Sequence, residues 1–134
     1  DAHASEKSML NTPNTFGWYV AGKMFDWYKK EGGVKKMEER SIEKSDTLYS
    51  LIDNSDFYIN PVNKEQRSIC NVVFTLSNPD LDNKFLEESD VQGLKYLKGH
   101  RTVGGMRASI YNSLPMEAVE SLVDFMRSFE AKYG

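Results

Sequence analysis

Apolar side chains recur every three or four residues over residues 15–30, which predicts a helix. Asn11, Thr12 and Pro13 come just before it and are typical of a helix start. One apolar stripe is formed by Phe16, Val20, Met24 and Trp27, and three aromatic residues extend it around the helix: Tyr19, Phe25 and Tyr28. Helices that are apolar on most sides are buried. We therefore expect this helix to pack against a larger body of protein that is absent from this chain.

The same spacing predicts two amphipathic helices further along. One covers residues 34–52, after Gly32 and Gly33 have ended the first helix. The other begins after Pro115, and its apolar positions are Met116, Val119, Leu122, Met126, Phe129 and Tyr133. Charged residues occupy the opposite face of each helix, as expected of a face in contact with water.

Strands and one more helix are predicted between these two. The clearest strand is residues 68–76, because alternation places Cys70, Val72, Phe74 and Leu76 on one face. Shorter strands are expected at residues 57–59, 97–103 and 107–111, and a helix at residues 77–93. This order indicates an α+β fold: a small, mainly antiparallel sheet with helices packed on one side. We place a domain boundary at residues 31–33, with a tail and one long helix in residues 1–32 and the compact domain in residues 33–134.

Composition narrows the classes of function. The chain has 134 residues, 40% hydrophobic and 28% charged, which is typical of a soluble globular protein. A net charge of −3 argues against a nucleic-acid partner, and no apolar run is long enough for a membrane span. The single cysteine, Cys70, in an expected buried strand, fits a reducing, cytoplasmic setting. Only two histidines are present, so no metal site is expected.

The start of the chain indicates processing or a fragment of a longer protein. It begins at Asp1 without a methionine. Residues 1–8 are polar and show no periodic pattern, so we expect them to be frayed.

Residues 99–109 contain the most distinctive chemistry. Arg101 and Arg107 each present a fork of donors that matches carboxylate or phosphate oxygens, and His100 can add a donor. The segment therefore predicts a receptor for a small dianion; the plainer alternative is a Gly-Gly hairpin with surface arginines. A two-residue turn at Gly104 and Gly105 would place His100 and Arg107 on one face and Arg101 on the other. All three could then meet one ligand only if the turn is irregular or one group acts at the rim.

No reactive group is evident. The chain lacks a nucleophile–base pair and a Gly-rich phosphate loop. No lysine stands alone in an apolar run, where burial would lower its pKa; Lys98 comes nearest, and a solvated lysine is expected there. The helix start at Asn11 and Thr12 is a second candidate anion site, with an ordinary helix cap as its alternative.

Several runs of sequence, in the same order, resemble the phosphoserine aminotransferase family of fold-type I enzymes that depend on pyridoxal 5'-phosphate (PLP). They are Asn11-Thr12-Pro13, Gly32-Gly33-Val34 and residues 51–58, 85–89, 97–101 and 103–112. The resemblance covers residues 8–134 and corresponds to the C-terminal portion of such an enzyme, its small domain plus the preceding helix. Asn14 stands where the family often has proline.

The resemblance implies a cytoplasmic homodimer that transfers an amino group between glutamate and 3-phosphohydroxypyruvate, giving phosphoserine and 2-oxoglutarate, in serine and pyridoxine biosynthesis. It implies that Arg107 holds the substrate α-carboxylate. It also implies that His100 and Arg101 line the pocket for the phosphate or distal carboxylate, and that Asn11 and Thr12 reach the cofactor phosphate of the partner subunit. The family's Schiff-base lysine, pyridine-binding aspartate and stacking aromatic lie outside this chain. The chain therefore holds no catalytic residue, and alone it is expected to be inactive.

Two other interpretations remain open at this point. One is a free-standing domain that binds a small anion without catalysis. The other is an interaction module that uses the apolar helix at residues 16–28 as a docking surface.

Overall fold

The computed structural model describes residues 1–134. The chain forms two compact units, Asp1–Met37 and Glu38–Gly134. No helix in either unit is both long enough and apolar enough to cross a membrane.

The first unit contains two helices, α1 (Ala2–Ser5) and α2 (Thr15–Lys30). The expectation that residues 1–8 are frayed is wrong for α1, where the Asp1 side chain accepts a hydrogen bond from the backbone N–H of His3. The range expected for α2 is confirmed. None of its side chains is buried, and its large apolar residues are exposed: Phe16, Trp18, Tyr19, Val20, Met24 and Phe25.

A pair of glycines separates α2 from the next helix, α3 (Gly33–Asp53). Gly32 and Gly33 have φ angles of 101° and 77°, in the left-handed region that favours glycine. The helix expected over residues 34–52 is thus confirmed to within one residue at each end.

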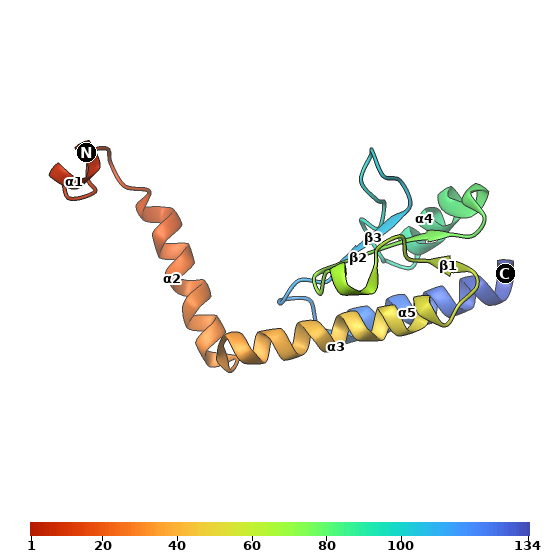
Figure 1. The fold of residues 1–134 in the computed structure, drawn as a ribbon. Helices are drawn as coiled ribbons and strands as arrows, with labels where there is room; N and C mark the ends of the chain where they lie inside the picture. The colour runs from red at the N-terminus through yellow and green to blue at the C-terminus, as the bar shows by residue number, and fades with distance from the viewer. The chain divides into compact units, whose positions relative to one another are not determined.

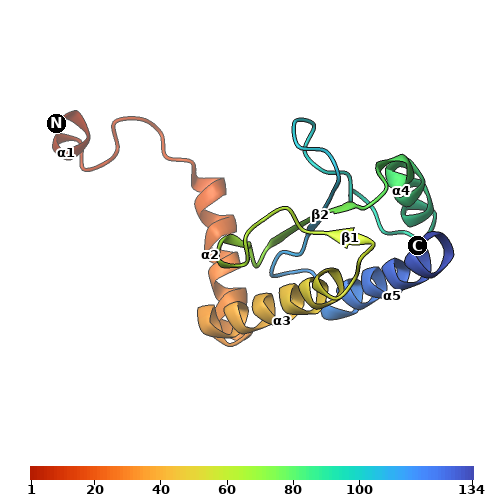
Figure 2. The ribbon, with the colours of Figure 1, turned by 45° about the vertical axis from the view of Figure 1, so that its right-hand side comes forward.

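The second unit is built on a three-stranded antiparallel sheet in the order β1 (Tyr58–Ile59), β2 (Asn71–Leu76) and β3 (Met106–Ser109). Side chains alternate along β2 and β3, and one face of the sheet is buried: Val72, Phe74, Leu76, Met106 and Ala108. Figures 1 and 2 show α3 and α5 (Met116–Tyr133) running side by side beneath the sheet. The α+β class with helices on one side is confirmed.

The core centres on Phe85 of α4 (Asp82–Val91), which is fully buried. Its ring meets four other aromatic rings at centroid distances of 5.0–6.3 Å: Tyr58, Phe74, Phe125 and Phe129. All four pairs are edge-on, a geometry that the ring quadrupole favours. This cluster joins β1, β2, α4 and α5 and so fixes the sheet that carries β3.

Several expected elements need correction. The helix expected at residues 77–93 is a 3₁₀ turn, Pro79–Leu81, followed by α4. The strand expected at residues 97–103 is wrong, since only Lys98 pairs, in a single bridge with Met106. Strand β2 begins at Asn71 instead of residue 68, which leaves Cys70 before the strand and half-buried. The strand expected at 107–111 is β3, shifted towards the N-terminus.

An ion pair fastens the β1–β2 connection to the end of α3. Arg67 donates two hydrogen bonds of 2.7 Å to the Asp53 carboxylate, and its guanidinium lies 4.7 Å from the centre of the Tyr49 ring. Lys64, in the short 3₁₀ turn Lys64–Gln66, lies 3.3 Å from the same carboxylate. Hydrogen bonding from Arg67 lowers the pKa of Asp53.

We expect Asp53→Asn to lower the free energy of unfolding by roughly 1 kcal/mol at pH 7. Because the folded-state pKa of Asp53 is lowered, its contribution is complete above about pH 4 and is lost as pH falls through the folded value. Urea unfolding at pH 7 and pH 2.5 measures this. Asp124→Asn, in an exposed pair with Arg127, is the control and should have little effect at either pH. If the difference in free energy of unfolding between wild type and Asp53→Asn is the same at both pH values, the ionised Asp53 carboxylate is not the source of the stabilisation.

Candidate functional site

A seven-residue loop, residues 99–105, projects from the sheet of the second unit, as Figures 1 and 2 show. The Lys98–Met106 bridge closes it, and inside that bridge the Gly99 N–H donates to the Gly105 carbonyl at 2.8 Å. The turn at its tip is formed by His100, whose carbonyl accepts from the N–H groups of Val103 and Gly104. The two-residue turn considered at Gly104 and Gly105 is therefore not present, and the turn is irregular.

Two glycines allow the loop to leave the sheet. A Cβ at Gly99 would overlap the carbonyl oxygen of Gly104 on the opposite arm. Gly105 has a φ of 61°, and a Cβ there would lie 2.7 Å from the carbonyl oxygen of Phe74. Glycine is thus required at both positions by close approach of backbone to backbone.

The resemblance to an aminotransferase predicts that Gly99→Ala lowers kcat/KM of the longer enzyme by about 100-fold, because a displacement of about 1 Å at a substrate-positioning group has this effect. The added methyl forces the closing arms apart and moves the loop tip. Steady-state kinetics measure the loss, and thermal unfolding measures the accompanying loss of stability as the two arms separate. Ser113→Ala, at an exposed loop position outside the site, is the matched control. Wild-type kinetics for Gly99→Ala rule out a role for the loop geometry.

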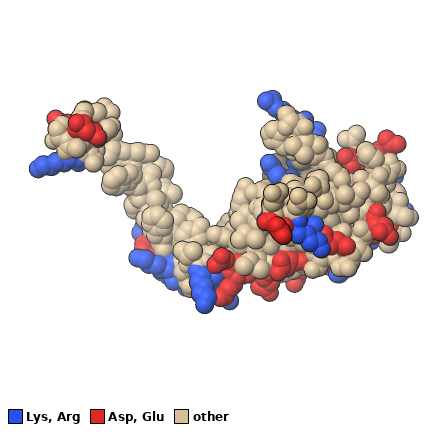
Figure 3. Space-filling view, viewed as in Figure 1, with Lys and Arg blue, Asp and Glu red and all other residues tan.

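The loop presents His100 and Arg101 to solvent. Both residues are exposed. His100 Nδ1 lies 2.7 Å from the hydroxyl of Thr102, which orients the ring and leaves Nε2 free of hydrogen bonds to the chain. Figure 3 shows basic atoms on the surface formed by this loop. The loop tip therefore presents two exposed donor side chains, and no neighbouring part of the second unit encloses them.

Arg107 lies on β3, on the face of the sheet opposite the helices. Its strand neighbours Met106 and Ala108 point into the core, and Arg107 points the other way by the two-residue period. The guanidinium makes no hydrogen bond or ion pair within the chain, although its Nε is buried. Arg67, by contrast, is neutralised by Asp53. A buried donor without a partner is costly, so Arg107 is suited to an anion from outside the chain.

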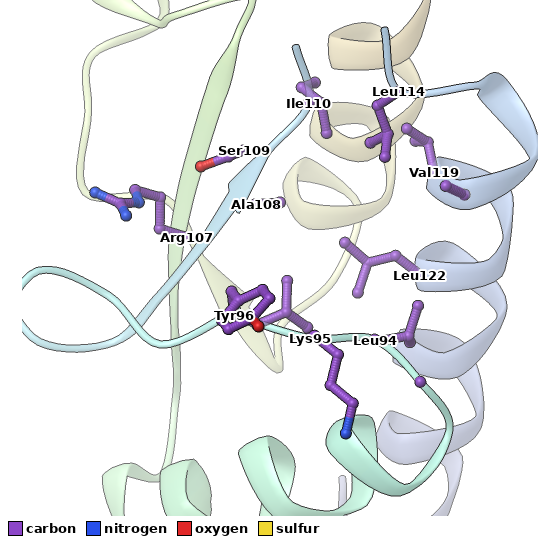
Figure 4. A pocket seen from close by; sticks show the side chains of 13 residues that line it. Leu94, Lys95, Tyr96, Arg107, Ala108, Ser109, Ile110, Leu114, Val119 and Leu122 are labelled. Atoms are coloured by element: carbon purple, nitrogen blue, oxygen red, sulfur yellow. The ribbon is translucent and has the colours of Figure 1, made fainter.

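A cavity of about 360 Å³ lies between β3 and α5. Its walls are mainly apolar, with Leu94, Ile110, Leu114, Val119 and Leu122 among the lining residues. Arg107 and Ser109 are also among the lining residues, although Figure 4 shows their side chains pointing away from Leu114, Val119 and Leu122. Neither His100 nor Arg101 lines this cavity. The structure therefore does not bring the three predicted side chains together in it.

The hydroxyl and amide groups beside Arg107 were not anticipated from the sequence. Asn71 on β2 pairs with Ser109 on β3, and Val73 pairs with Arg107. The Asn71 Oδ1 accepts hydrogen bonds from the Ser109 hydroxyl at 3.0 Å and the Tyr111 hydroxyl at 3.4 Å. In the sequence, strand alternation places residues 71 and 73 on one face of their strand and residues 107 and 109 on one face of theirs. Only the observed register of β2 and β3 shows that the two pairs are neighbours.

Asn11 and Thr12 lie before the start of α2. Both are exposed, and their side chains make no hydrogen bond within the chain. The residue that caps the helix is Asn14, whose side chain accepts from the Gly17 N–H at 3.0 Å. Asn11 and Thr12 are therefore not part of the helix cap, and they remain available to bind a phosphate group.

One lysine contradicts the expectation that none is desolvated. Lys44 of α3 is 3% exposed, and burial lowers the pKa of its ammonium group. Its Nζ donates to the carbonyl oxygens of Tyr111 and Leu114 at 2.6 and 3.0 Å, so it fixes the β3–α5 connection. Ser41 supports the same connection through Asn112 at 2.8 Å. Lys98, the candidate from the sequence, is exposed.

Comparison with known proteins places this arrangement in a family. The family described as aminotransferase class-V matches residues 2–122. Phosphoserine aminotransferase of Buchnera aphidicola subsp. Acyrthosiphon pisum (strain Tuc7) is 58% identical over 127 residues, which are 95% of this chain and 35% of that protein. The chain thus spans about a third of the length of the curated relatives it matches.

Solved structures agree with the sequence match. Phosphoserine aminotransferase from Bacillus circulans subsp. alkalophilus superposes with a TM-score of 0.92 at 38% identity, over 98% of this chain and 37% of that one. The PLP-bound phosphoserine aminotransferase from Trichomonas vaginalis gives a TM-score of 0.84 at 37% identity, over 93% and 36% of the two chains. The match runs through α2, the sheet and the site residues, and the chain therefore belongs to the aminotransferase class-V family.

Proposed function

We propose that this chain is the C-terminal portion of a phosphoserine aminotransferase. The full-length enzyme would transfer an amino group between glutamate and 3-phosphohydroxypyruvate, in serine and pyridoxine biosynthesis. The observation that carries the proposal is the 58% identity over nearly the whole chain, together with an arginine on β3 whose buried Nε has no partner. We also place the enzyme in the cytoplasm, as the resemblance implies; the single cysteine of this chain, Cys70, is unpaired, which fits a reducing setting.

The role of Arg107 is to hold a substrate carboxylate. Its guanidinium can donate two parallel hydrogen bonds to the two carboxylate oxygens, which fixes both position and orientation. No acidic residue lies on the same face of β2 or β3, where the other side chains are Asn71, Val73, Thr75 and Ser109. The open face therefore attracts an external carboxylate without competition from the chain.

The role of His100 and Arg101 is to bind the second anionic group, the phosphate of one substrate and the distal carboxylate of the other. Arginine suits both groups, and histidine adds a donor whose ring is already oriented by Thr102. Because the loop tip is exposed, it needs an opposing wall from the remainder of the enzyme or from a second subunit. We propose that a homodimer with shared active sites supplies it.

Asn11 and Thr12 fit the phosphate of PLP, because both are exposed and carry unused donors. When bound, PLP supplies the electron sink for transfer of the amino group. This chain's part is to anchor and orient: Asn11 and Thr12 at the cofactor phosphate, Arg107 and the loop at the substrate. The resemblance places the lysine that reacts with PLP outside this chain, so we expect the chain alone to have no transaminase activity.

The domain assignment follows from the same proposal. Residues 1–32 would belong to the large PLP-binding domain, and residues 33–134 would form the small domain. Six large apolar residues of α2 are exposed, at 42% to 76% of their surface. In the full-length enzyme we expect the large domain to cover them.

The proposal is tested with the purified full-length protein, supplied with PLP, glutamate and 3-phosphohydroxypyruvate. We expect production of 2-oxoglutarate and phosphoserine, with a far lower rate when pyruvate replaces the phosphorylated substrate. The phosphorylated threonine analogue, assayed in the reverse direction, measures selectivity. Absence of turnover with the phosphorylated substrates, in a protein that is folded and holds PLP, would contradict the proposed activity.

An interaction module is the second candidate, because of the exposed apolar surface of α2. It predicts that the full-length protein leaves this surface open for another protein. Hydrogen exchange of α2 amides in the full-length enzyme separates the two functions. Strong protection in the purified enzyme supports the aminotransferase arrangement, and rapid exchange supports the module.

A further inference from the structure

A polar ledge lies beside Arg107 on the open face of the sheet. Asn71, Ser109 and Tyr111 form it, and hydrogen bonds of 3.0 and 3.4 Å link both hydroxyls to one atom, the Asn71 side-chain oxygen. The amide nitrogen of Asn71 makes no hydrogen bond in the structure, and the residue is half-buried. The oxygen is therefore saturated and the –NH₂ group keeps both donors unused.

The register of β2 and β3 places this amide next to the arginine. Asn71 is directly opposite Ser109, and Arg107 is opposite Val73, two residues along the same face. Diagonal neighbours of this kind have Cβ atoms about 7–8 Å apart, within reach of long side chains. Figure 4 shows Arg107 and Ser109 pointing to the same side of the sheet. A carboxylate bound at the guanidinium would therefore lie within reach of the Asn71 amide.

The charge on this face favours an anion. Arg107 has a buried, unpartnered Nε, and Val73, Thr75, Ser109 and Tyr111 around it carry no negative charge. Arg67, another half-buried arginine, is held by the Asp53 carboxylate. A planar carboxylate has two oxygens with about four lone-pair sites, and the guanidinium fork leaves one or two of them free. Asn71 supplies a neutral donor for a remaining site.

We propose that Asn71 is a substrate-binding residue whose amide, held by Ser109 and Tyr111, donates the additional hydrogen bond to the carboxylate bound by Arg107. This inference rests on the proposed function of Arg107 and deepens it. It assigns Ser109 and Tyr111 as positioning residues, which act on the substrate only through the orientation of Asn71.

The test is Asn71→Asp in the full-length enzyme. Aspartate has the same shape and keeps an oxygen for Ser109 and Tyr111, but it replaces the –NH₂ group with a negatively charged oxygen. We expect kcat/KM for glutamate to fall by at least about 30-fold, through KM rather than kcat, because a donor to the carboxylate is lost and a like charge is introduced. Asn83→Asp, an exposed position on α4, makes the same change in charge away from the sheet and should match wild type.

A second measurement uses the wild-type enzyme and does not depend on folding of the variant. In ¹⁵N-labelled protein, 2-oxoglutarate should shift the Asn71 side-chain NH₂ resonances with a saturable dependence that Arg107→Ala abolishes. Absence of any shift at saturating 2-oxoglutarate overturns the inference.

Different results would overturn the role of Asn71 and the carboxylate site at Arg107. Wild-type kinetics for Asn71→Asp, together with a large loss for Arg107→Ala, overturn the role of Asn71 and leave the proposed function standing. Wild-type kinetics for Arg107→Ala overturn the carboxylate site itself. A loss shared equally by Asn71→Asp and Asn83→Asp shows a general effect of charge and also overturns the role of Asn71.

Discussion

We expect Arg107→Ala to lower kcat/KM of the proposed full-length aminotransferase by about a thousand-fold, which corresponds to roughly 4 kcal/mol of transition-state stabilisation. The truncation removes both donors of the bidentate pair and leaves the substrate carboxylate desolvated without a counter-charge. The fold should survive, because the guanidinium makes no hydrogen bond or ion pair within the chain. Steady-state kinetics with each substrate, paired with circular dichroism, measure the effect.

Two further variants sharpen this prediction. Arg107→Lys keeps the charge and loses the fork, so its kcat/KM should lie between those of wild type and Arg107→Ala. Arg127→Ala, at an exposed position of α5 in a 3.6 Å pair with Asp124, should leave kinetics unchanged. An Arg107→Ala enzyme with unaltered kcat/KM removes Arg107 from the site.

Phe85→Ala produces the largest loss of stability that we expect in the second unit, about 3–5 kcal/mol. Phe85 is fully buried and its ring contacts four aromatic rings drawn from β1, β2 and α5. The truncation leaves a cavity that rigid strand and helix backbones cannot fill. The effect is measured by urea unfolding of the isolated chain, followed by near-ultraviolet circular dichroism.

Val91→Ala is the matched control for this variant. Val91 lies on the same helix, α4, and is 88% exposed, so its truncation should change stability by less than about 0.5 kcal/mol. The loss of stability for Phe85→Leu should lie between those of Phe85→Ala and Val91→Ala, because leucine retains much of the buried volume. Equal stability of Phe85→Ala and Val91→Ala contradicts the description of the core.

The helices could be predicted closely because their apolar spacing is long and regular. Residues 15–30 form α2 as expected, and α3 and α5 differ from expectation by at most one residue at an end. The strand expected at residues 97–103 failed for a steric reason. Gly99 packs against the carbonyls of the opposite arm, and the chain turns at His100, so pairing stops at Lys98.

The candidate site was accessible from the sequence only in part. The residue types in residues 99–109 indicated anion binding, and the structure adds that Arg107 has a buried, unpartnered donor. Lys44 and Asn71 could not be found in this way. The burial of Lys44 depends on carbonyls 67 and 70 residues away, and the setting of Asn71 depends on hydroxyls 38 and 40 residues away. Local periodicity carries no information about such pairings.

We propose that this portion of the enzyme recognises the substrate anions while the reacting groups lie elsewhere. The most direct measurement compares the full-length wild type with the triple variant His100→Ala/Arg101→Ala/Arg107→Ala, for bound PLP and for kcat/KM with phosphoserine. We expect the triple variant to retain its full content of PLP, with kcat/KM reduced by at least about ten-thousand-fold. A triple variant that retains PLP and turns over phosphoserine within tenfold of wild type contradicts this proposal.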